Sequence, residues 1–347
     1  MAFSLSRPGL QNVAGNDQAL FLKIFAGEVL TAFHTANKII PLGMVRTLKN
    51  AKSASFPVTG RAYANWHTVG NSVFDDAPAS SFGSTANYLN SIPHSEIEVF
   101  ADEPIVAPIT VADIDEMRNH YDLRSIYAGE LGQALAKRAD KNALGALYAV
   151  AASTTQNAFR TSNASDGTGT GAAAPIAFSG GTYGPAGFEK FCFDAQAELA
   201  RLGVPKEDRC VVVRPDLYYA YIESGSKSLS KDYSQGNGDF AGAEIYRVAG
   251  LPIVMSETFG DLTANNSAET DAGSKNGYYS AVDWTTVGAM VFHKSALATV
   301  KMADISIKTD YITERLSTLM LGVYVMGHKG LRPEAAIVGT VSNLTLA

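Results

Sequence analysis

The chain has 347 residues, of which 46% are hydrophobic and 18% charged, and its formal net charge is −6. This length exceeds one ordinary core and predicts two subdomains, and the composition excludes a disordered chain. The net negative charge argues against tight, non-specific DNA binding, which depends on clustered lysine and arginine. No stretch reaches the roughly 18 apolar residues of a membrane span, and no signal-peptide-length apolar run follows Arg7, so we expect no membrane partner.

The N-terminal part of the chain has first a helical and then an extended pattern. Residues 1–16 are typical of a flexible arm, and apolar spacing predicts a helix over Asp17–His34 that packs either on its own core or on a neighbouring subunit. Residues 44–64 favour strand, residues 65–94 a long tip with aromatic side chains, and Glu96–Asp102 a half-buried strand. So long a tip is unusual inside a compact domain and suggests a hairpin that rests on a partner.

The strongest helical spacing lies in the middle of the chain. Thr110-Val-Ala-Asp113 is a variant of the capping box, and the apolar positions from Ile114 to Ala146 keep to one face. The pattern predicts a helix over about 110–152, which would be roughly 60 Å long at a rise of 1.5 Å per residue. Residues 153–187 are rich in Ala, Gly, Ser and Thr and are predicted to form a loop.

The C-terminal half alternates between helical and strand patterns. Helices are expected over Phe188–Leu202 and Pro215–Ile222, and polar loops over 224–242 and 260–277. Strands are expected at Arg209–Arg214, Glu244–Val248, Leu251–Ser256, Val287–His293, Ala298–Met302, Ile305–Thr309, Leu319–Met326 and Ala335–Val341.

None of the motifs in the sequence carries catalytic or cofactor chemistry. Gly167-Thr-Gly-Thr-Gly171 lacks both the spacing and the strand–helix setting of a phosphate loop. The six histidines are scattered, without metal-ligand spacing, and the acids between Asp113 and Glu116 suit the first turn of a helix. Cys192 and Cys210 have apolar neighbours and are predicted to be buried structural thiols in a reducing compartment. We therefore expect no enzyme activity, no cofactor and no metal.

Four long stretches carry a resemblance to a known family: Ala19–Phe33, Ser53–Arg61, Asp113–Arg124 and Met326–Ala336. The last belongs to the run Tyr324–Val338, in which an Arg-Pro-Glu-Ala turn separates two apolar strands. All four are similar, and in the same order, to the major capsid protein of T-seven-like short-tailed phages (podoviruses). The resemblance extends over nearly the whole chain and is weak at residues 153–187 and 224–280.

The resemblance implies the tailed-phage capsid fold, known from the Hong Kong ninety-seven phage, which is an α+β fold. It also implies a virion capsid protein that assembles in the host cytoplasm. Copies would form the hexamers and pentamers of an icosahedral shell around double-stranded DNA. The implied segments are an N-terminal arm at 1–43, an extended hairpin loop at 44–105, a peripheral domain with a long spine helix at 106–187, an axial domain at 188–295, and C-terminal strands of the peripheral domain at 296–347.

Subunit contacts take the place of an active site in this fold. The resemblance implies that the extended loop lies across one neighbouring subunit and that the arm reaches another. The implied partners are further copies of the chain, a separate scaffolding protein, a portal protein, packaged double-stranded DNA in weak non-specific contact, and in some cases a decoration protein. The candidate inter-subunit contacts are Phe21, Phe25, Trp66, Phe74, Phe82, Tyr88, Arg332 and Glu334.

Two departures from relatives of this fold bear on assembly. Some relatives crosslink the shell through Lys–Asn isopeptide bonds from a lysine on the extended loop, whereas this chain has no lysine between Lys52 and Lys137. We therefore expect a shell without covalent crosslinks. Relatives with a fused scaffold carry a long helical N-terminal extension, whereas the first helix here is expected near residue 17, which favours a separate scaffold.

Other functions compete with the capsid interpretation. An encapsulin-type compartment would share the fold, and a co-purifying cargo enzyme would indicate it. A cytosolic α+β enzyme is compatible with composition alone, and a monomer with a tight small-molecule ligand would indicate it. A phage tail or portal component would form rings or tubes instead of shells.

Overall fold

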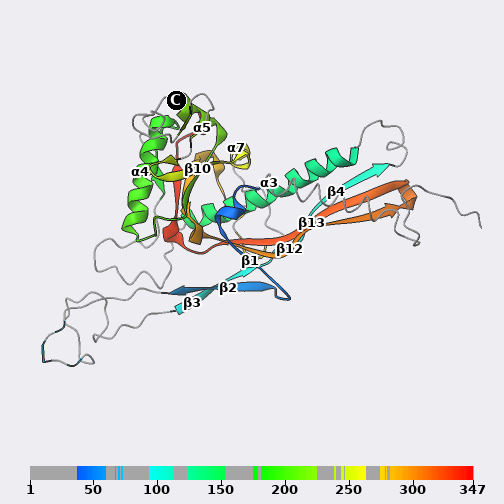
Figure 1. The fold of residues 1–347 in the computed structure, drawn as a ribbon, viewed down its shortest axis with the longest axis horizontal. Coiled ribbons are helices and arrows are strands. Elements are labelled where there is room, and N and C mark those ends of the chain that lie inside the picture. The colour runs from blue at the N-terminus through cyan, green and yellow to red at the C-terminus, as the bar shows by residue number, and fades with distance from the viewer. Residues whose placement is uncertain are drawn as a thin grey trace, which may run out of the picture.

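The protein is described by a computed structural model. The helix predicted at Asp17–His34 lies outside the described residues. Figure 1 shows a lobe of helices and strands from which a long sheet and a smaller hairpin project in different directions. The described residues are 37–59, 67, 69–70, 72, 94–112, 123–152, 175–178, 181–224, 238–239, 244–245, 247–262, 274–277, 279 and 282–346.

A long four-stranded sheet forms the projecting part of the body. Its strands lie in the order β1 (Met44–Thr47), β12 (Leu297–Ile312), β13 (Ser317–Gly330) and β4 (Ile105–Ala112). β1 pairs in parallel with β12, and the other two pairings are antiparallel. β12 and β13 form a ribbon of 16 and 14 residues, and helix α3 (Leu123–Ala151) lies along the sheet (Figure 1).

The alternation of side chains explains why α3 covers one face of this sheet. Successive residues of a strand point to opposite faces, and residues that oppose each other on paired strands share a face. Val111 of β4 and Met320 of β13 pack against Ala128 and Leu131 of α3 in one buried cluster. α3 therefore covers the face to which these side chains point, and the residues between them point to the other face.

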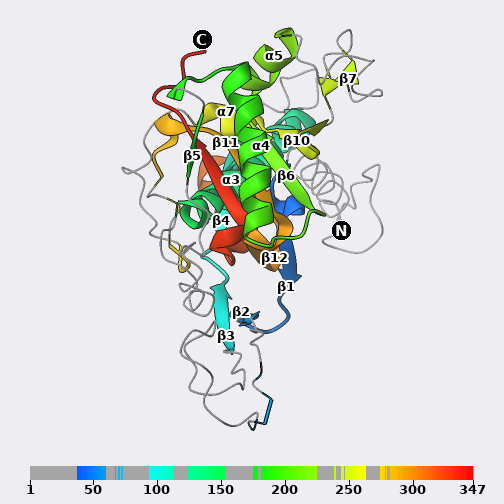
Figure 2. The ribbon, with the colours of Figure 1, turned by 90° about the vertical axis from the view of Figure 1, so that its left-hand side faces the viewer.

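A six-stranded sheet forms the core of the other lobe. β6 runs parallel to β10 and antiparallel to β11, and β11 pairs with β14. Every residue of β6 is buried, as expected of a strand covered on both faces. Figure 2 shows helix α4 (Pro185–Arg201) in front of this sheet. The strand order is β5 (Ile176–Ala177), β14 (Ala336–Thr340), β11 (Val287–His293), β6 (Arg209–Val213), β10 (Leu251–Met255) and β9 (Arg247–Val248).

Two further helices belong to the described part of this lobe. α5 (Pro215–Glu223) starts with a proline, whose missing N–H costs nothing in the first turn. α7 (Glu257–Asp261) is capped by the Ser256 hydroxyl, which accepts a hydrogen bond from the Phe259 N–H. The short elements are η1 (Ile40–Leu42), β7 (Gly238–Asp239), β8 (Glu244–Ile245), η5 (Trp284–Thr286), η6 (Lys294–Ala296), η7 (Thr313–Arg315) and η8 (Pro333–Ala335).

The predicted hairpin is present as a separate two-stranded sheet. β2 (Ser53–Thr59) pairs antiparallel with β3 (His94–Phe100), in a register that places Ser53 opposite Phe100 and Thr59 opposite His94. Figure 2 shows this hairpin below the rest of the molecule. β1 lies in the segment predicted as the extended loop, and it pairs with β12.

The predicted start of the long helix is wrong. Thr110 and Val111 belong to strand β4, which the sequence analysis missed, and residues 113–122 lie outside the described part of the chain. Pairing with β13 decides the conformation here, because eight consecutive residues of β4 find partners there. Pro108 fits this strand because β4 lies at the end of the sheet order, where proline is tolerated.

The C-terminal strands divide between the two sheets. The strands expected at Ala298–Met302 and Ile305–Thr309 are one strand, β12, with register shifts between Lys301 and Ser306. β12 and β13 lie beside β4, whereas β14 pairs with β11 in the six-stranded sheet. The domain boundaries given above stay a prediction. Among the described residues, no helix is long and apolar enough to cross a membrane.

Candidate assembly surfaces

Apolar packing and two cationic side chains attach the hairpin to the body. Phe56 and Val99 are buried in one cluster with Ala298, Val300 and Leu331. The Arg46 guanidinium lies 4.4 Å from the centre of the Phe56 ring and donates to the Ser55 carbonyl at 3.0 Å. The Lys329 ammonium donates to the Glu98 carbonyl at 2.9 Å. The hairpin therefore packs on the face of the ribbon that is opposite to α3.

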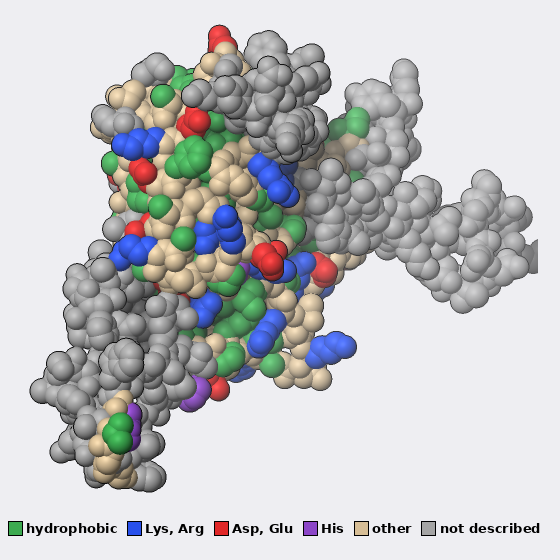
Figure 3. All heavy atoms as spheres, turned by 60° about the vertical axis from the view of Figure 1, so that its left-hand side comes forward, with side chains coloured by type: hydrophobic (Ala, Val, Ile, Leu, Met, Phe, Trp, Pro, Cys, Tyr) green, Lys and Arg blue, Asp and Glu red, His purple; other side chains and the backbone are tan. Residues whose placement is uncertain are grey.

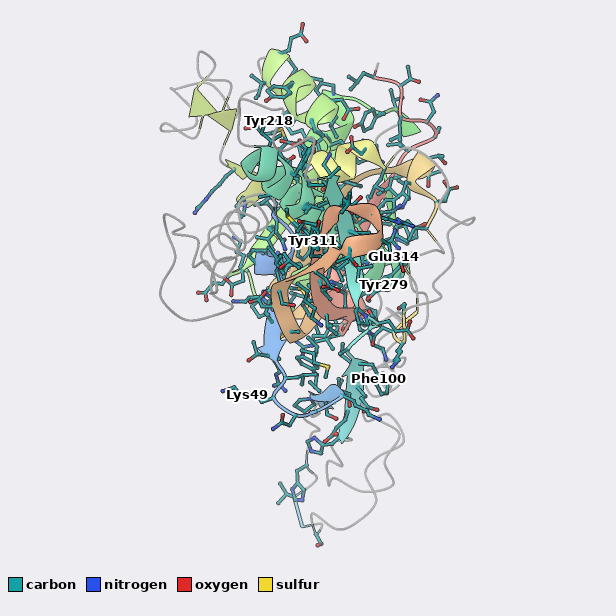
Figure 4. The ribbon with its side chains drawn as sticks, turned by 90° about the vertical axis from the view of Figure 1, so that its right-hand side faces the viewer. Lys49, Phe100, Tyr218, Tyr279, Tyr311 and Glu314 are labelled. Atoms are coloured by element: carbon teal, nitrogen blue, oxygen red, sulfur yellow. The ribbon has the colours of Figure 1, made fainter. Side chains whose placement is uncertain are left out.

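A buried polar cluster lies where β3 ends, and we call Phe100, Asp102, Asn276, Tyr279 and His328 the root junction. The Asp102 carboxylate accepts hydrogen bonds from the Tyr279 hydroxyl at 2.7 Å, the Lys275 N–H at 2.8 Å and the Asn276 amide at 3.0 Å. The His328 N–H donates to the Tyr279 oxygen at 2.9 Å. Figure 4 shows Phe100 and Tyr279 on different segments of this region.

Burial controls the ionisation of the root junction. It raises the pKa of Asp102, and the hydrogen bonds from Tyr279, Lys275 and Asn276 oppose that shift. Burial also lowers the pKa of His328 to about 3, with a further contribution from the positive charge of Lys301. His328 is therefore neutral at physiological pH.

The face of the long sheet that α3 does not cover carries an apolar strip, which we call the outer face. Leu321 opposes Pro108 and Val323 opposes Val106 across the β13–β4 pair, so all four side chains point away from α3. Val106 is 51% exposed and the two β13 side chains are half-buried. A strip of adjacent apolar side chains on a rigid sheet is typical of a protein–protein contact.

The tip of the ribbon is a second candidate surface. Leu316 is 66% exposed and has a left-handed backbone with φ of 47°. Such a conformation is unfavourable for leucine, and backbone strain of this kind occurs preferentially at functional sites. Glu314 and Arg315 provide charges of both signs beside it, and Tyr311 lies nearby on β12. Figure 4 labels Tyr311 and Glu314 on this part of the ribbon.

Two of the predicted contact residues lie in the described part of the chain. The Glu334 side chain is buried against its own chain, and one of its oxygens lies 3.6 Å from Nε of Arg332, which is partly exposed. Their role between subunits stays a prediction. The other six predicted contacts, Phe21, Phe25, Trp66, Phe74, Phe82 and Tyr88, lie outside the described residues.

The prediction of buried cysteines is confirmed. Cys192 and Cys210 are both buried and free, and burial raises the pKa of each thiol, that of Cys210 to about 12. Neither thiol is a competent nucleophile at neutral pH, because the thiolate is the reactive form. In the part of the chain that the structure describes, no three His, Cys, Asp or Glu side chains form a metal-binding group.

Comparison of sequences identifies the relatives of the chain. A model of the family described as "Gp10A-like: Major capsid protein" matches residues 55–339. The chain is 30% identical over 338 residues to the major capsid protein of Escherichia phage T7, which covers 93% of this chain and 92% of the relative. It is 29% identical over 336 residues to the major capsid protein of Enterobacteria phage T3, with coverage of 93% and 92%.

Solved structures agree with the sequence relatives. The capsid of cyanophage P-SCSP1u is similar, with a TM-score of 0.69, 28% identity, and coverage of 99% of this chain and 100% of that one. The mature capsid of bacteriophage PhiM1 has a TM-score of 0.65 at 17% identity, with coverage of 89% and 88%, which shows the fold alone. The fold of a long helix on a ribbon, a second sheet and a projecting hairpin is that of a tailed-phage capsid subunit.

The family follows from the extent of these matches. The chain belongs to the Gp10A-like major capsid protein family. The resemblance that the sequence carried is thereby confirmed, and so is the α+β tailed-phage capsid fold. A virus-like particle from Pyrococcus furiosus also shares the fold, with a TM-score of 0.50 at 10% identity. The encapsulin-type alternative is not favoured, because the sequence relatives are phage capsid proteins.

Proposed function

We propose that copies of this chain assemble as hexamers and pentamers into an icosahedral shell around packaged double-stranded DNA. Assembly would take place in the host cytoplasm on a separate scaffolding protein, with a portal protein at one vertex and a decoration protein as an optional surface partner. The observation that supports contact between copies most directly is the apolar outer face, on a chain that belongs to a capsid family. The role is structural, without catalysis.

The outer face and the ribbon tip suit repeated contact between identical subunits. Burial of one exposed apolar side chain such as Leu316 contributes only about 1.5–3 kcal/mol. Closed symmetry repeats each such contact around the shell, so weak contacts become collectively stable. The adjacent opposite charges of Glu314 and Arg315 let one tip meet the same tip of another copy without net repulsion.

Weak contact with DNA agrees with the charge of the chain. The net charge is −6, and Figure 3 shows Lys and Arg side chains interspersed with Asp and Glu on the described part of the face turned to the viewer. Tight non-specific binding of a duplex requires a clustered basic surface, because its affinity comes from released counterions. A mixed surface would allow packaged DNA to move along the shell wall.

Negative-stain electron microscopy of the purified full chain tests this function. We expect round shells of uniform size when the chain is produced with its scaffolding protein, and incomplete or irregular assemblies without it. Small uniform particles under both conditions would contradict the capsid function. Uniform closed shells from the chain alone would contradict only the need for a scaffold.

The ribbon tip offers a substitution that tests the contact itself. Leu316→Asp adds a charge to a side chain that is already exposed, so the fold should persist while the contact between copies is lost. We expect soluble, folded subunits and at least a tenfold lower shell yield in sedimentation. The loss of about 1.4 kcal/mol from one contact lowers an association constant tenfold. The matched control is Leu346→Asp, at another exposed leucine away from the ribbon. Equal shell yields from wild type and Leu316→Asp would contradict a contact at the tip.

A further inference from the structure

Three segments that are far apart in the sequence meet at the root junction. Phe100 and Asp102 end the hairpin, Asn276 and Tyr279 belong to the segment that precedes η5, and His328 lies on β13. The hydrogen bonds between hairpin and segment span more than 170 positions of the chain. The junction therefore joins the projecting hairpin to both the ribbon and the lobe of the six-stranded sheet.

All the hydrogen bonds to the Asp102 carboxylate come from donors in one short segment. Their donors, the Lys275 N–H, the Asn276 amide and the Tyr279 hydroxyl, all come from the segment 274–279, and the acceptor belongs to the hairpin end. The Ser274 hydroxyl contributes a longer contact at 3.5 Å and also accepts from the Gly277 N–H, which shapes the turn. A short segment is thus folded around one carboxylate.

The Asn276 side chain takes the place of a neighbouring strand beside Phe100. Its carbonyl oxygen accepts from the Phe100 N–H at 3.0 Å, and its amide nitrogen donates to the Phe100 carbonyl at 2.7 Å. A Cβ at Gly327 would overlap the Phe100 carbonyl oxygen and come within 2.9 Å of the Asn276 amide nitrogen. The Asn276 amide therefore holds the backbone of Phe100 through two hydrogen bonds, and the missing side chain at Gly327 leaves room for this contact.

The apolar attachment of the hairpin alone leaves its direction free. Hydrophobic burial of Phe56 and Val99 is non-directional, and the hydrogen bonds from Arg46 and Lys329 to the hairpin are exposed to solvent. The hydrogen bonds to Asp102 from Asn276 and Tyr279 are buried, and hydrogen bonds weaken steeply when donor and acceptor are misaligned. We propose that Asp102 and Asn276 are positioning residues that fix the direction in which the hairpin leaves the body. The consequence for the shell rests on the proposed function, in which the hairpin meets a neighbouring subunit.

Hydrogen exchange of the unassembled full chain tests the positioning role independently of assembly. The variants are Asp102→Ala, Asn276→Ala and the double variant, each followed by mass spectrometry of peptides from 53–59 and 94–99. We expect exchange in these peptides to accelerate about tenfold, with α4 peptides unchanged, because only the hairpin loses its fixed end. The double variant should match the single ones, because both residues act in one network.

Controls separate positioning from general stability. Asp283→Ala removes a carboxylate that accepts from the Thr285 N–H and hydroxyl within its own turn, and it should leave hairpin exchange unchanged. Tyr279→Phe keeps the ring and removes one hydroxyl, so it serves if an alanine variant does not fold. Unchanged hairpin exchange in folded variants, or equal acceleration in α4, would overturn the proposal.

Shell morphology tests the consequence for assembly. If wild type forms uniform shells, Asp102→Ala and Asn276→Ala should give shells of mixed diameter or open sheets at the same protein concentration. Shells identical to wild type, combined with faster hairpin exchange, would overturn the role in assembly. If wild type forms no shells, the proposed function fails, and the exchange experiment still decides whether the two residues position the hairpin.

Discussion

At the scale of single residues, the buried Arg214 connects several backbone segments through its hydrogen bonds. Its guanidinium donates to the carbonyl oxygens of Val287, Leu262 and Trp284 at 2.6–3.0 Å and lies 4.7 Å from the centre of the Phe259 ring. Leu262 follows α7, whereas Trp284 and Val287 lie in the continuous η5–β11 segment. One side chain therefore links the end of β6 to two other segments through charge-assisted hydrogen bonds.

Arg214→Lys should be strongly destabilising although it keeps the charge. A lysine ammonium presents its donors from one point and does not reproduce the planar fork, so one or more of these hydrogen bonds are lost. We expect the free energy of unfolding to fall by about 3 kcal/mol in a denaturant titration. Arg201→Lys is the matched control, because that side chain is 43% exposed and pairs with Glu198, and it should change stability by less than about 0.5 kcal/mol. A similar loss in both variants would contradict this account.

We expect the free energy of unfolding to depend on pH because of the buried His328. Its pKa is lowered to about 3 in the folded protein, whereas an unfolded histidine titrates near about 6.5. Unfolding therefore takes up a proton between these values, and the free energy of unfolding falls as the pH is lowered from about 6.5 towards 3, by up to about 1.4 kcal/mol per pH unit.

The comparison with His328→Asn isolates this effect. Asparagine has a polar atom that replaces Nδ1, which lies 3.0 Å from the Thr299 hydroxyl, and it does not titrate. Burial raises the pKa of Asp140 to about 6. The contribution of this carboxyl to the free energy of unfolding therefore increases as the pH falls from about 6 to 4. This contribution is the same in wild type and in His328→Asn, so it cancels in the comparison. The difference between the two denaturation series should therefore grow below pH 6.5. Parallel series would contradict a neutral buried His328.

At the scale of elements, α3 holds the two sheets together. Its C-terminal half is in the main core, where Leu144 and Leu147 are fully buried, and its N-terminal half packs on the ribbon through Ala128 and Leu131. Leu147→Ala should lower the free energy of unfolding by about 2–5 kcal/mol, because a cavity remains. Ile126→Ala on the same helix is the control, since this side chain is 54% exposed, and it should cost less than about 0.5 kcal/mol. Thermal or denaturant unfolding measures both, and equal losses would contradict the packing described.

Local sequence patterns predicted the presence of the helices and strands better than their first and last residues. The strand Val287–His293 was predicted with its observed bounds, because a short continuous apolar run is typical of a strand that is covered on both faces. β4 was missed because Thr110 and Asp113 formed a helix-capping pattern, while its alternating burial depends on β13, some 200 positions away in the sequence. Pairing partners at such distances leave no local signal.

The candidate site was predicted only in part, for the same reason. The hairpin was expected from its extended strands and is present as β2 and β3. The root junction was missed, because nothing near Asp102 in the sequence shows that its donors lie on 274–279. The exposed Leu316 was missed as well, since a left-handed leucine has no sequence signature.

At the scale of the whole molecule, the absence of lysine from the hairpin predicts a shell without covalent crosslinks. Residues 53–136 contain no lysine, so the hairpin has no amine for an isopeptide bond. Boiled particles on a denaturing gel should give one band near the chain mass of 36.8 kDa. A ladder of multiples of this mass would contradict the prediction. Particles treated with an amine-reactive crosslinker before boiling serve as a positive control for the ladder.

Pro108 has a consequence for how the chain is produced in quantity. A shell requires many copies at high concentration, and β4 is the last strand in the order of the long sheet. Unprotected sheet edges template fibrous aggregation, and a proline removes a backbone donor from such an edge. Folding subunits would thus avoid association through backbone hydrogen bonds at this edge, and they would associate through side-chain contacts during shell assembly.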